Sequence, residues 1–291
     1  MKKVWFTICS DVHLMDRVPK CRGEEQEQWL QKQIAFIHQF SKEVNPIIAG
    51  DVFDVPERNS CRLMYDILSN ITKPIMAIAG NHDTPLLNNS FISYSSFGIL
   101  RKQGVLKEID LDGVEGIDYL NDKELSERLS EIKPTTKVVV VHRFLCDTKL
   151  PHMNELGFIN NFIRLVPKHV KLLIAGDNHT RFICNVDNRT VLNCGSVHRI
   201  TAAQVEYSPC YYRVYDDLSI EPVEIDCSND IISREYIDIE KEKERKLTEY
   251  VQHINTMEVQ PFSSFSDVIM KKAKGTECEN YIKDLYGRIR K

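Results

Sequence analysis

The segment AIAGNHDTP (Ala77–Pro85) changes character at its glycine, where an apolar run gives way to Asn, His and Asp. The same change occurs in PIIAGDVFD (Pro46–Asp54) and in KLLIAGDNH (Lys171–His179). Two further apolar runs, VWFTICSDVH (Val4–His13) and KVVVVHR (Lys137–Arg143), end in metal-type ligands without that glycine. Short runs that are rich in Val and Ile and apolar throughout are typical of strands buried on both faces. The pattern therefore predicts five buried strands, each followed by a polar loop.

Helical patterns lie between these runs. Residues 24–44 place apolar side chains along one stripe, and shorter candidates follow at 60–71, 121–132 and 153–166. The candidate at 121–132 opens with an Asn or Asp that suits an N-cap. Because strands and helices alternate along the chain, we expect a layered α/β domain.

The sequence pattern changes from residue 181 onward. Residues 181–225 form two predicted hairpins, which turn on Asp187–Asn188 and on Asp216–Asp217. We expect this β-rich part to form a second sheet packed against the first. Charged helical segments follow, with a break near Pro261. The predicted domains are residues 1–225 and a helical C-terminal extension of residues 226–291.

Composition excludes several classes of protein. The chain has 291 residues and is 42% hydrophobic, which is enough for a sizeable core. The net charge of -4 gives no global basic signature, so a nucleic-acid surface would have to be a local patch. Nine scattered cysteines, without a CxxC pair, fit neither a disulfide framework nor a zinc finger. No apolar run approaches the ~18 residues of a membrane span, so we expect a cytoplasmic protein without a membrane partner.

The polar loops carry the chemistry. Ligands bind at the carboxyl edge of an open α/β sheet, where these loops would meet. Carboxylate, amide and imidazole ligands in one mixture suit Mn²⁺, Fe²⁺ or Zn²⁺. They are more numerous than one ion needs, so two ions that share a bridging carboxylate are expected, about 3.5–4 Å apart as in centres for displacement at phosphorus. The candidate side chains are Asp11, His13, Asp51, Asn81, His82, Asp83, His142, Asp177 and His179.

These motifs resemble those of the calcineurin-like metallophosphoesterase superfamily. They stand in family order as SDVH, AGDVFD, AGNHD, VHR and AGDNH, within residues 4 to about 215. The resemblance implies a two-sheet sandwich flanked by helices, the four-layer α/β/β/α fold, with the C-terminal helical extension behind it. It also implies two divalent ions, of which Mn²⁺ is preferred and Mg²⁺, Fe²⁺ and Zn²⁺ are alternatives. By position, the first ion would be held by Asp11, His13, Asp51 and His179, and the second by Asp51, Asn81, His142 and residue 177.

The resemblance also assigns catalytic roles. His82 would contact the phosphate and protonate the leaving oxygen, and Asp83 would orient its ring. From its position alone, and not from the resemblance, Asp54 is expected to cap or brace the GDVFD loop. The chain departs from the family pattern at Asp177, where the family has His; a carboxylate can still ligate and favours Mn²⁺ or Mg²⁺ over Zn²⁺. His198 is an alternative ligand, although a non-ligating role is favoured for it.

The residues that flank these motifs also resemble the SbcD-type branch, whose members are nuclease subunits in DNA double-strand-break repair. That likeness implies DNA as the substrate, exonuclease and endonuclease activity by a two-metal mechanism, and a homodimer. It also implies an SMC-like coiled-coil ATPase partner, for which residues 226–291 would be the docking segment. Candidates for contact with DNA phosphates are Arg17, Arg22 and Arg143.

Other functions remain open. A small-molecule phosphodiesterase or phosphatase would use the same centre without an ATPase. A non-catalytic scaffold of the same fold would fit the departure at Asp177, but retention of His82 and Asp83 argues against it. The C-terminal extension has an equally simple alternative, an ordinary helix packing on its own domain.

Overall fold

The structure is a computed structural model that describes residues 2–255 and 265–289. The chain divides into two compact units, Met1–Ser233 and Arg234–Lys291. The division falls after Ser233 rather than after residue 225, because the intervening residues belong with the first unit. Asp230, for example, forms an ion pair with Arg22.

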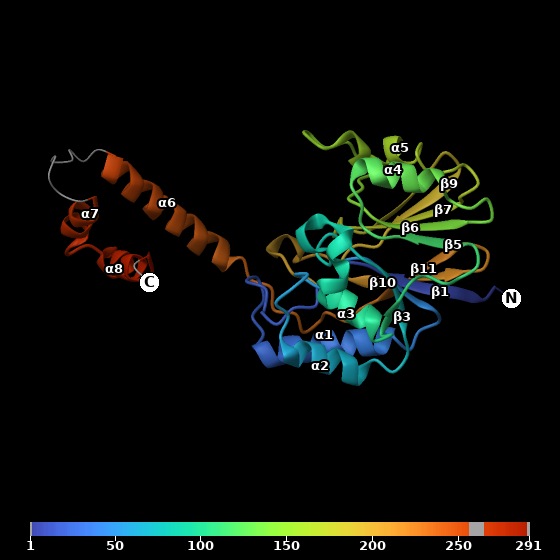
Figure 1. Cartoon of the computed structure of the whole chain (residues 1–291), viewed down its shortest axis with the longest axis horizontal. Coiled ribbons are helices and arrows are strands. Elements are labelled where there is room, and N and C mark those ends of the chain that lie inside the picture. Colours follow the sequence, from blue (N-terminus) through green and yellow to red (C-terminus); the bar gives the residue numbers. More distant parts are fainter. Residues whose placement is uncertain (1, 256–264, 290–291) are drawn as a thin grey trace. The chain divides into compact units, whose positions relative to one another are not determined.

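The first unit contains two mixed sheets (Figure 1). The first sheet has the order β11-β10-β1-β2-β3-β4, in which β1 to β4 are parallel and the β10–β11 hairpin is antiparallel. Its strands are β1 (Val4–Cys9), β2 (Pro46–Ala49), β3 (Ile75–Ile78), β4 (Leu106–Lys107), β10 (Cys210–Tyr215) and β11 (Ile220–Glu224). The second sheet has the order β5-β6-β7-β9-β8. Its strands are β5 (Val114–Ile117), β6 (Val138–His142), β7 (Leu172–Gly176), β8 (Phe182–Val186) and β9 (Arg189–Asn193).

The five predicted strands are all present and buried, but they are shared between the sheets. β1, β2 and β3 lie in the first sheet, whereas β6 and β7 lie in the second. The expectation that residues 181–225 alone form the second sheet is therefore wrong. The β8–β9 hairpin extends the second sheet and the β10–β11 hairpin extends the first, because each hairpin pairs with the edge of an existing parallel sheet.

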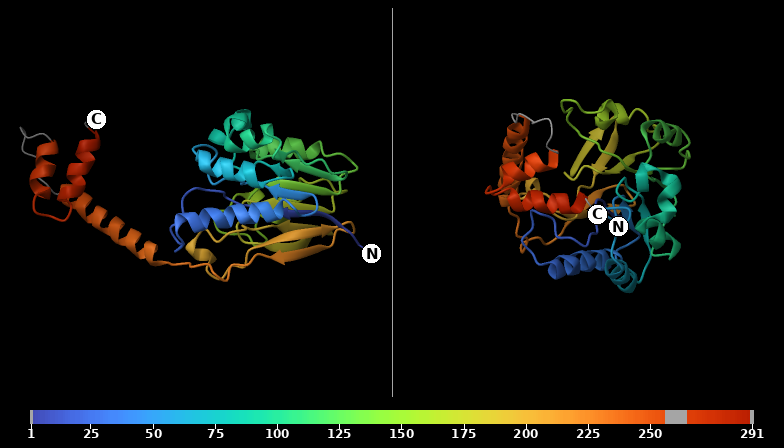
Figure 2. Two further views of the ribbon diagram at one scale, coloured as in Figure 1. Left: turned by 90° about the horizontal axis from the view of Figure 1, so that it is seen from below. Right: turned by 60° about the vertical axis from the view of Figure 1, so that its left-hand side comes forward.

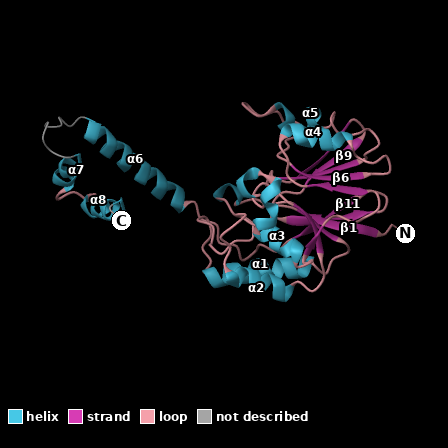
Figure 3. Cartoon of the chain, in the orientation of Figure 1, coloured by secondary structure: helices cyan, strands magenta, loops and turns pink. Residues whose placement is uncertain are grey.

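The helices cover the outer faces of the sandwich, as Figures 2 and 3 show. The helices α1, α2 and α3 pack on the first sheet, and α4 and α5 pack on the second. A third apolar cluster fills the space between the sheets, where Phe6 and Ile47 meet Val138 and Leu172. The fold is thus the expected four-layer α/β/β/α sandwich. The helix bounds are α1 (Gln26–Phe40), α2 (Cys61–Asn70), α3 (Ser96–Lys102), α4 (Asp122–Ser130) and α5 (Ile159–Phe162).

Local signals explain several boundaries. Asn121 caps α4 through a capping box with Glu124, as its sequence predicts. Both residues of the Asp187–Asn188 turn have positive φ, 52° and 57°, as a two-residue hairpin turn requires. The helix expected over 153–166 is broken into short pieces, η3 (Glu155–Gly157) and α5. The remaining 3-10 turns are η1 (Pro85–Leu87), η2 (Asn89–Tyr94) and η4 (Ala202–Gln204).

The second unit is helical, as expected. It consists of α6 (Glu235–Asn255), α7 (Phe265–Ala273) and α8 (Glu279–Ile289), with a small apolar cluster around Ile269 and Ile282. The break expected near Pro261 lies outside the described residues. Within 2–255 and 265–289, no helix is both long and apolar enough to cross a membrane.

Candidate metal centre

The predicted ligands sit on unusual backbone. Asp11, His13, Asp51 and Asp177 have φ values of 52°, 48°, 50° and 85°. An L-residue in the left-handed region costs roughly 1–2 kcal/mol, and such conformations cluster at functional sites. Four strained positions at the ends of three strands therefore indicate that these loops are shaped for a task other than chain reversal.

The glycines of the motifs are explained by close approach. A Cβ atom on Gly80 would lie 2.0 Å from Asp51 Oδ1, and one on Gly176 would lie 2.0 Å from Ser10 Oγ. Gly50 has φ of 94°, and a Cβ there would lie 2.1 Å from His142 Nδ1. Each glycine thus lets one strand end press against a neighbour, which draws the polar loops together.

Replacing Gly80 with Ala is therefore expected to displace Asp51 and to weaken Mn²⁺ binding at least about tenfold, as loss of a supporting contact does at metal sites. The matched control is Gly113→Ala. Gly113 also resists substitution, with φ of 77°, but a Cβ there has its nearest contact at 3.5 Å. Calorimetric Mn²⁺ titration of both variants checks this; equal Mn²⁺ affinity in the two would contradict it.

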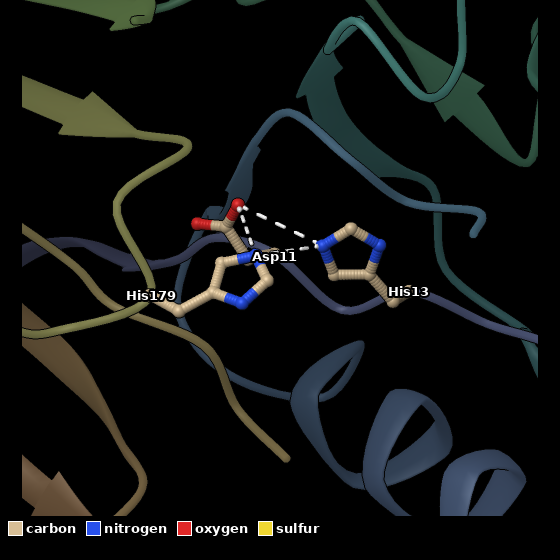
Figure 4. Close-up of side chains that lie close together, drawn as sticks. All are labelled: Asp11, His13 and His179. Atoms are coloured by element: carbon tan, nitrogen blue, oxygen red, sulfur yellow. Dashed lines mark hydrogen bonds and ion pairs between the residues drawn. The ribbon is translucent and has the colours of Figure 1, made fainter. Parts of the chain in front are cut away.

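One set of ligands gathers around Asp11 (Figure 4). His13 Nε2 lies 3.1 Å from His179 Nε2, and these two nitrogens lie 3.9 Å and 3.6 Å from Asp11 Oδ1. Two imidazole nitrogens this close repel unless a proton or a cation lies between their lone pairs. Burial lowers the pKa of His13 to about 3, so its ring is neutral and offers a lone pair. Asp11, His13 and His179 are therefore suited to a divalent ion.

A second set gathers around Asp51. Its Oδ2 lies 3.3 Å from His142 Nε2 and 3.6 Å from His13 Nε2. Asn81 Oδ1 lies 2.9 Å from the same His142 nitrogen. His142 Nδ1 donates to the Ala49 carbonyl at 2.8 Å, the backbone contact that typically fixes a metal-binding imidazole with its other nitrogen towards the ion.

Asp51 stands between the two sets. Ligand atoms lie within 4.8 Å of one another in three groups, Asp11–His13–His179, Asp11–Asp51–His142 and His13–Asp51–His82. The structure thus brings together six of the predicted residues, with Asn81 beside them. Asp11, His13 and Asp51 each belong to two of the groups, and the Asp51 carboxylate contacts both His13 and His142, as a bridging carboxylate would.

The electrostatics of the centre also fit bound cations. Burial raises the pKa of Asp11 to about 7, so its carboxylate is costly to keep charged without a counter-ion. Burial also lowers the pKa of His142, but Asp51 outweighs it and raises the value to about 10. The protonated ring of His142 therefore serves as the counter-ion of these carboxylates. A divalent ion bound at the same carboxylates would fill that role more strongly.

The structure corrects the role expected for Asp83. Its carboxylate is fully buried and accepts three backbone N–H groups, from Val52 at 3.0 Å, Phe53 at 2.9 Å and Gly80 at 2.9 Å. It therefore ties two metal loops together rather than orienting the His82 ring. Residue adjacency in the sequence misled the prediction, because the side chain turns away into the loop that follows β2.

The ring of His82 is oriented by a backbone carbonyl. The ring Nδ1–H of His82 donates to the backbone carbonyl of Asp54 at 2.6 Å. The backbone N–H of His82 donates to Asp51 Oδ1 at 2.9 Å. Burial lowers the pKa of His82, but Asp51 and the Asp54 carbonyl raise it more, so the net shift is upward. Any residue type can supply a backbone carbonyl, so the sequence could not predict this acceptor.

Asp177 and His198 lie in different surroundings. The Asp177 N–H donates to both Asp11 oxygens, at 3.1 and 3.2 Å, and its charge raises the pKa of His142, but its carboxylate is in none of the three ligand groups. Ligation by Asp177 stays a prediction. His198 is buried between the rings of Trp29 and Phe36, at centroid distances of 5.4 and 5.5 Å. Its role is packing, as the favoured interpretation has it.

Two of the three predicted DNA contacts lie at the rim of the centre. Arg17 is 76% exposed and pairs with Asp54 at 3.0 Å. Arg143 follows the ligand His142 and pairs with Asp122 at 2.5 Å. Arg17 is thus free to exchange its partner for a phosphate, whereas Arg143 is more enclosed.

Arg22 is a correction, because its guanidinium is buried. The side chain is 0% exposed and donates to Asp230 at 2.8 Å, to Glu24 at 3.0 Å and to the Arg199 carbonyl at 3.0 Å. It also stacks over Trp29, 4.7 Å from the ring centre. The N–H groups of the Arg22 guanidinium all have partners inside the protein. Arg22 therefore holds residues 226–233 against the rest of the first unit and is not placed to contact DNA.

Replacing Arg22 with Leu is expected to lower the free energy of unfolding by about 3–5 kcal/mol, because it leaves Glu24 without its buried partner and leaves Asp230 paired with Lys32 alone. Urea denaturation measures this, with the exposed Arg17→Leu, expected within about 0.5 kcal/mol, as the control. A loss below about 1 kcal/mol for Arg22→Leu would show that the buried network contributes little.

With this geometry in place, comparison with known proteins is informative. The model of the calcineurin-like phosphoesterase family matches residues 4–181. The DNA double-strand break repair protein Mre11 of Sulfolobus acidocaldarius is 25% identical over 189 residues, which cover 59% of this chain and 48% of that protein. The chain thus spans about half the length of this curated relative.

Solved structures of similar fold are more distant in sequence. An archaeal phosphodiesterase is 14% identical, with 77% of this chain and 100% of that one covered and a TM-score of 0.38. The phosphopantetheinyl hydrolase of Mycobacterium tuberculosis is 12% identical, with coverage of 77% and 96% and a TM-score of 0.42.

The family match spans more than half of the chain and contains the loops after β1, β2, β3, β6 and β7. Those loops, together with His142 at the end of β6, carry every residue of the three ligand groups. This protein belongs to the calcineurin-like phosphoesterase family.

Proposed function

We propose that this chain is a DNA nuclease of the SbcD and Mre11 type, which hydrolyses phosphodiester bonds with two divalent ions. The observation that carries the proposal is the 189-residue similarity to a relative named for DNA double-strand break repair. The ligand groups around Asp11 and Asp51 support it, because a pair of ions sharing a carboxylate suits in-line displacement at phosphorus.

The ligand geometry supports two sites. Asp11, His13 and His179 would hold one ion, and Asn81 and His142 would hold the other. Asp51 would bridge them, and Asp177 would complete the second site. We propose Mn²⁺ as the metal, because imidazole nitrogens are mixed with several oxygens and Asp177 adds a further hard ligand. Ions bound there would neutralise phosphate charge and activate water at neutral pH.

The chain's own contribution to the reaction centres on His82. Because Nδ1–H donates to the Asp54 carbonyl, the second proton of the ring must be carried on Nε2. The hydrogen bond to the Asp54 carbonyl, which raises the pKa of His82, favours this doubly protonated ring. His82 would then donate the Nε2 proton to the departing sugar oxygen, while Asp83 keeps the loops that carry Asp51 and His82 in register.

DNA would lie across the rim of the centre. Arg17 is the favoured phosphate contact because it is exposed, and Arg143 stays a weaker candidate because it is paired with Asp122. The net charge of -4 means that such local contacts have to work against overall repulsion.

We also propose that residues 234–291 dock an SMC-like coiled-coil ATPase, and that the nuclease acts as a homodimer in the cytoplasm. On α6 the side chains of Ile239, Leu247 and Val251 are 55%, 57% and 47% exposed. Their spacing places them within about 120° on one helix face, which suits an apolar partner helix. Copurification with a coexpressed ATPase should be lost when the chain is truncated after residue 233; unchanged copurification would contradict the docking role.

The nuclease proposal is tested by Mn²⁺-dependent hydrolysis of labelled single-stranded and double-stranded DNA, beside the small diester bis(p-nitrophenyl) phosphate. We expect cleavage of DNA that EDTA abolishes and Mn²⁺ restores. Hydrolysis of the small diester without any cleavage of DNA would instead identify a small-molecule phosphodiesterase. Metal-bound protein inert towards both would identify a scaffold.

A further inference from the structure

The edge of β3 is only partly covered by its neighbouring strand. β4 pairs with β3 at Ile75 and Met76 and goes no further. Beyond that point, the backbone groups of Ala77 and Ala79 on the open side need other partners. This stretch leads directly into Gly80, Asn81 and His82, so whatever holds it also sets the position of a metal ligand and of the leaving-group acid.

Two charged side chains take the place of the missing strand. Arg101 of α3 donates to the Ala77 carbonyl at 3.1 Å, and Asp118, just after β5, accepts the Ala79 N–H at 2.7 Å. The two side chains also pair with each other in a bidentate arrangement, at 2.9 and 2.8 Å. The Ala79 carbonyl accepts the N–H of Tyr119 at 2.8 Å, which completes the set.

The pair is held from both sides of the sandwich. Arg101 stacks on Phe97 of its own helix, with 4.7 Å between the guanidinium carbon and the ring centre. Asp118 is fixed by β5, which passes so close to β3 that a Cβ on Gly116 would lie 2.6 Å from Ile78 Cγ2. Arg101 belongs to the layer outside the first sheet and Asp118 to the second sheet, so their bidentate contact fixes the end of β3 relative to both.

We propose that Arg101 and Asp118 form a clamp that positions Asn81 and His82. They are positioning residues, because they act through the backbone of Ala77 and Ala79 and not on the phosphate. The inference rests on the two-ion centre proposed above. Its consequence is selective: the site that contains Asn81 should depend on the clamp, whereas the site formed by Asp11, His13 and His179 should not.

A nearby cleft makes the clamp testable without unfolding the protein. A cavity of about 730 Å³ lies beside it, lined by Arg101, Asp118 and Arg128 among others. Water can enter the space left by a shortened side chain, so truncation leaves no dry void. Arg128 supplies a matched control, because it lines the same cavity and its ion pairs within the described residues go to Glu115 on β5, at 3.1 Å, and to Glu131, not to β3.

The experiment compares Arg101→Ala, Asp118→Asn and Arg128→Ala by Mn²⁺ titration calorimetry and by amide hydrogen exchange. We expect Arg101→Ala to weaken one of the two Mn²⁺ sites, the one that contains Asn81, about 10–100-fold, the usual effect of losing a residue that supports a metal ligand. Exchange of the Ala79 and Gly80 amides should accelerate at least about tenfold. Asp118→Asn should show a smaller effect, because the amide oxygen can still accept the Ala79 N–H, and Arg128→Ala should match the wild type.

Unchanged exchange at Ala79 and Gly80, with wild-type Mn²⁺ affinity in Arg101→Ala, would overturn the clamp. So would equal changes in Arg101→Ala and Arg128→Ala. These outcomes are separate from failure of the proposed function, which appears in the wild type itself as a single Mn²⁺ site or as an absence of DNA cleavage. The exchange measurement needs no metal, so it reads the clamp even in that case.

Discussion

Replacing Asp51 with Asn is expected to lower kcat for phosphodiester hydrolysis at least about 10³-fold, which corresponds to about 4 kcal/mol of barrier. Asp51 Oδ2 lies 3.6 Å from His13 Nε2 and 3.3 Å from His142 Nε2, and so faces ligands of both proposed sites. The substitution keeps the size of the side chain but removes the charge that would bridge two ions. Steady-state kinetics in saturating Mn²⁺, with parallel calorimetric titration, measures the loss.

The control for this substitution is Asp54→Asn, three residues along the same loop. The Asp54 carboxylate pairs with Arg17 and lies 3.8 Å from His13 Nδ1, but it belongs to none of the three ligand groups. Its replacement should lower kcat by no more than about 10–100-fold, the usual cost of losing a side chain that supports a metal ligand. Equal losses in the two variants, or full Mn²⁺ binding by Asp51→Asn, would contradict a bridging role.

Replacing His82 with Ala is expected to lower the rate of DNA cleavage by about 10²–10⁴, the usual contribution of a positioned general acid. Mn²⁺ affinity should change little. The loss should be far smaller for bis(p-nitrophenyl) phosphate, because p-nitrophenolate leaves without a proton. Comparing the two substrates therefore separates proton donation from binding or folding.

The exposed histidine His152 supplies the control, since His152→Ala should leave both activities unchanged. His82 does lie in one candidate ligand group, with His13 and Asp51. If His82→Ala abolishes Mn²⁺ binding, or slows both substrates equally, His82 is a metal ligand and the assignment as a general acid fails.

The sequence predicted the features that depend on short, continuous runs of residues. Apolar runs that end in polar motifs located β1, β2, β3, β6 and β7, because both faces of these strands are buried. The metal centre followed from the same runs, since parallel strands deliver their carboxyl ends to a common edge. The nine cysteines are free, as their scatter indicated.

What the sequence could not show depends on partners far along the chain. Arg22 looked like an exposed cation because its counter-ion, Asp230, is 208 positions away. The sheet that each strand joins is set by pairing across the fold, so the β8–β9 and β10–β11 hairpins could not be assigned to different sheets. The acceptors for His82 and His142 are backbone carbonyls, which every residue type supplies equally.

The central claim is that the loops after five strands assemble one centre for two divalent ions. Crystals grown with Mn²⁺ and measured at the manganese absorption edge test it most directly. We expect two anomalous peaks roughly 3.5–4 Å apart, one beside Asp11, His13 and His179 and the other beside Asn81 and His142, with Asp51 between them. A map with no peak among these side chains, or with manganese bound elsewhere on the first unit, would contradict the account.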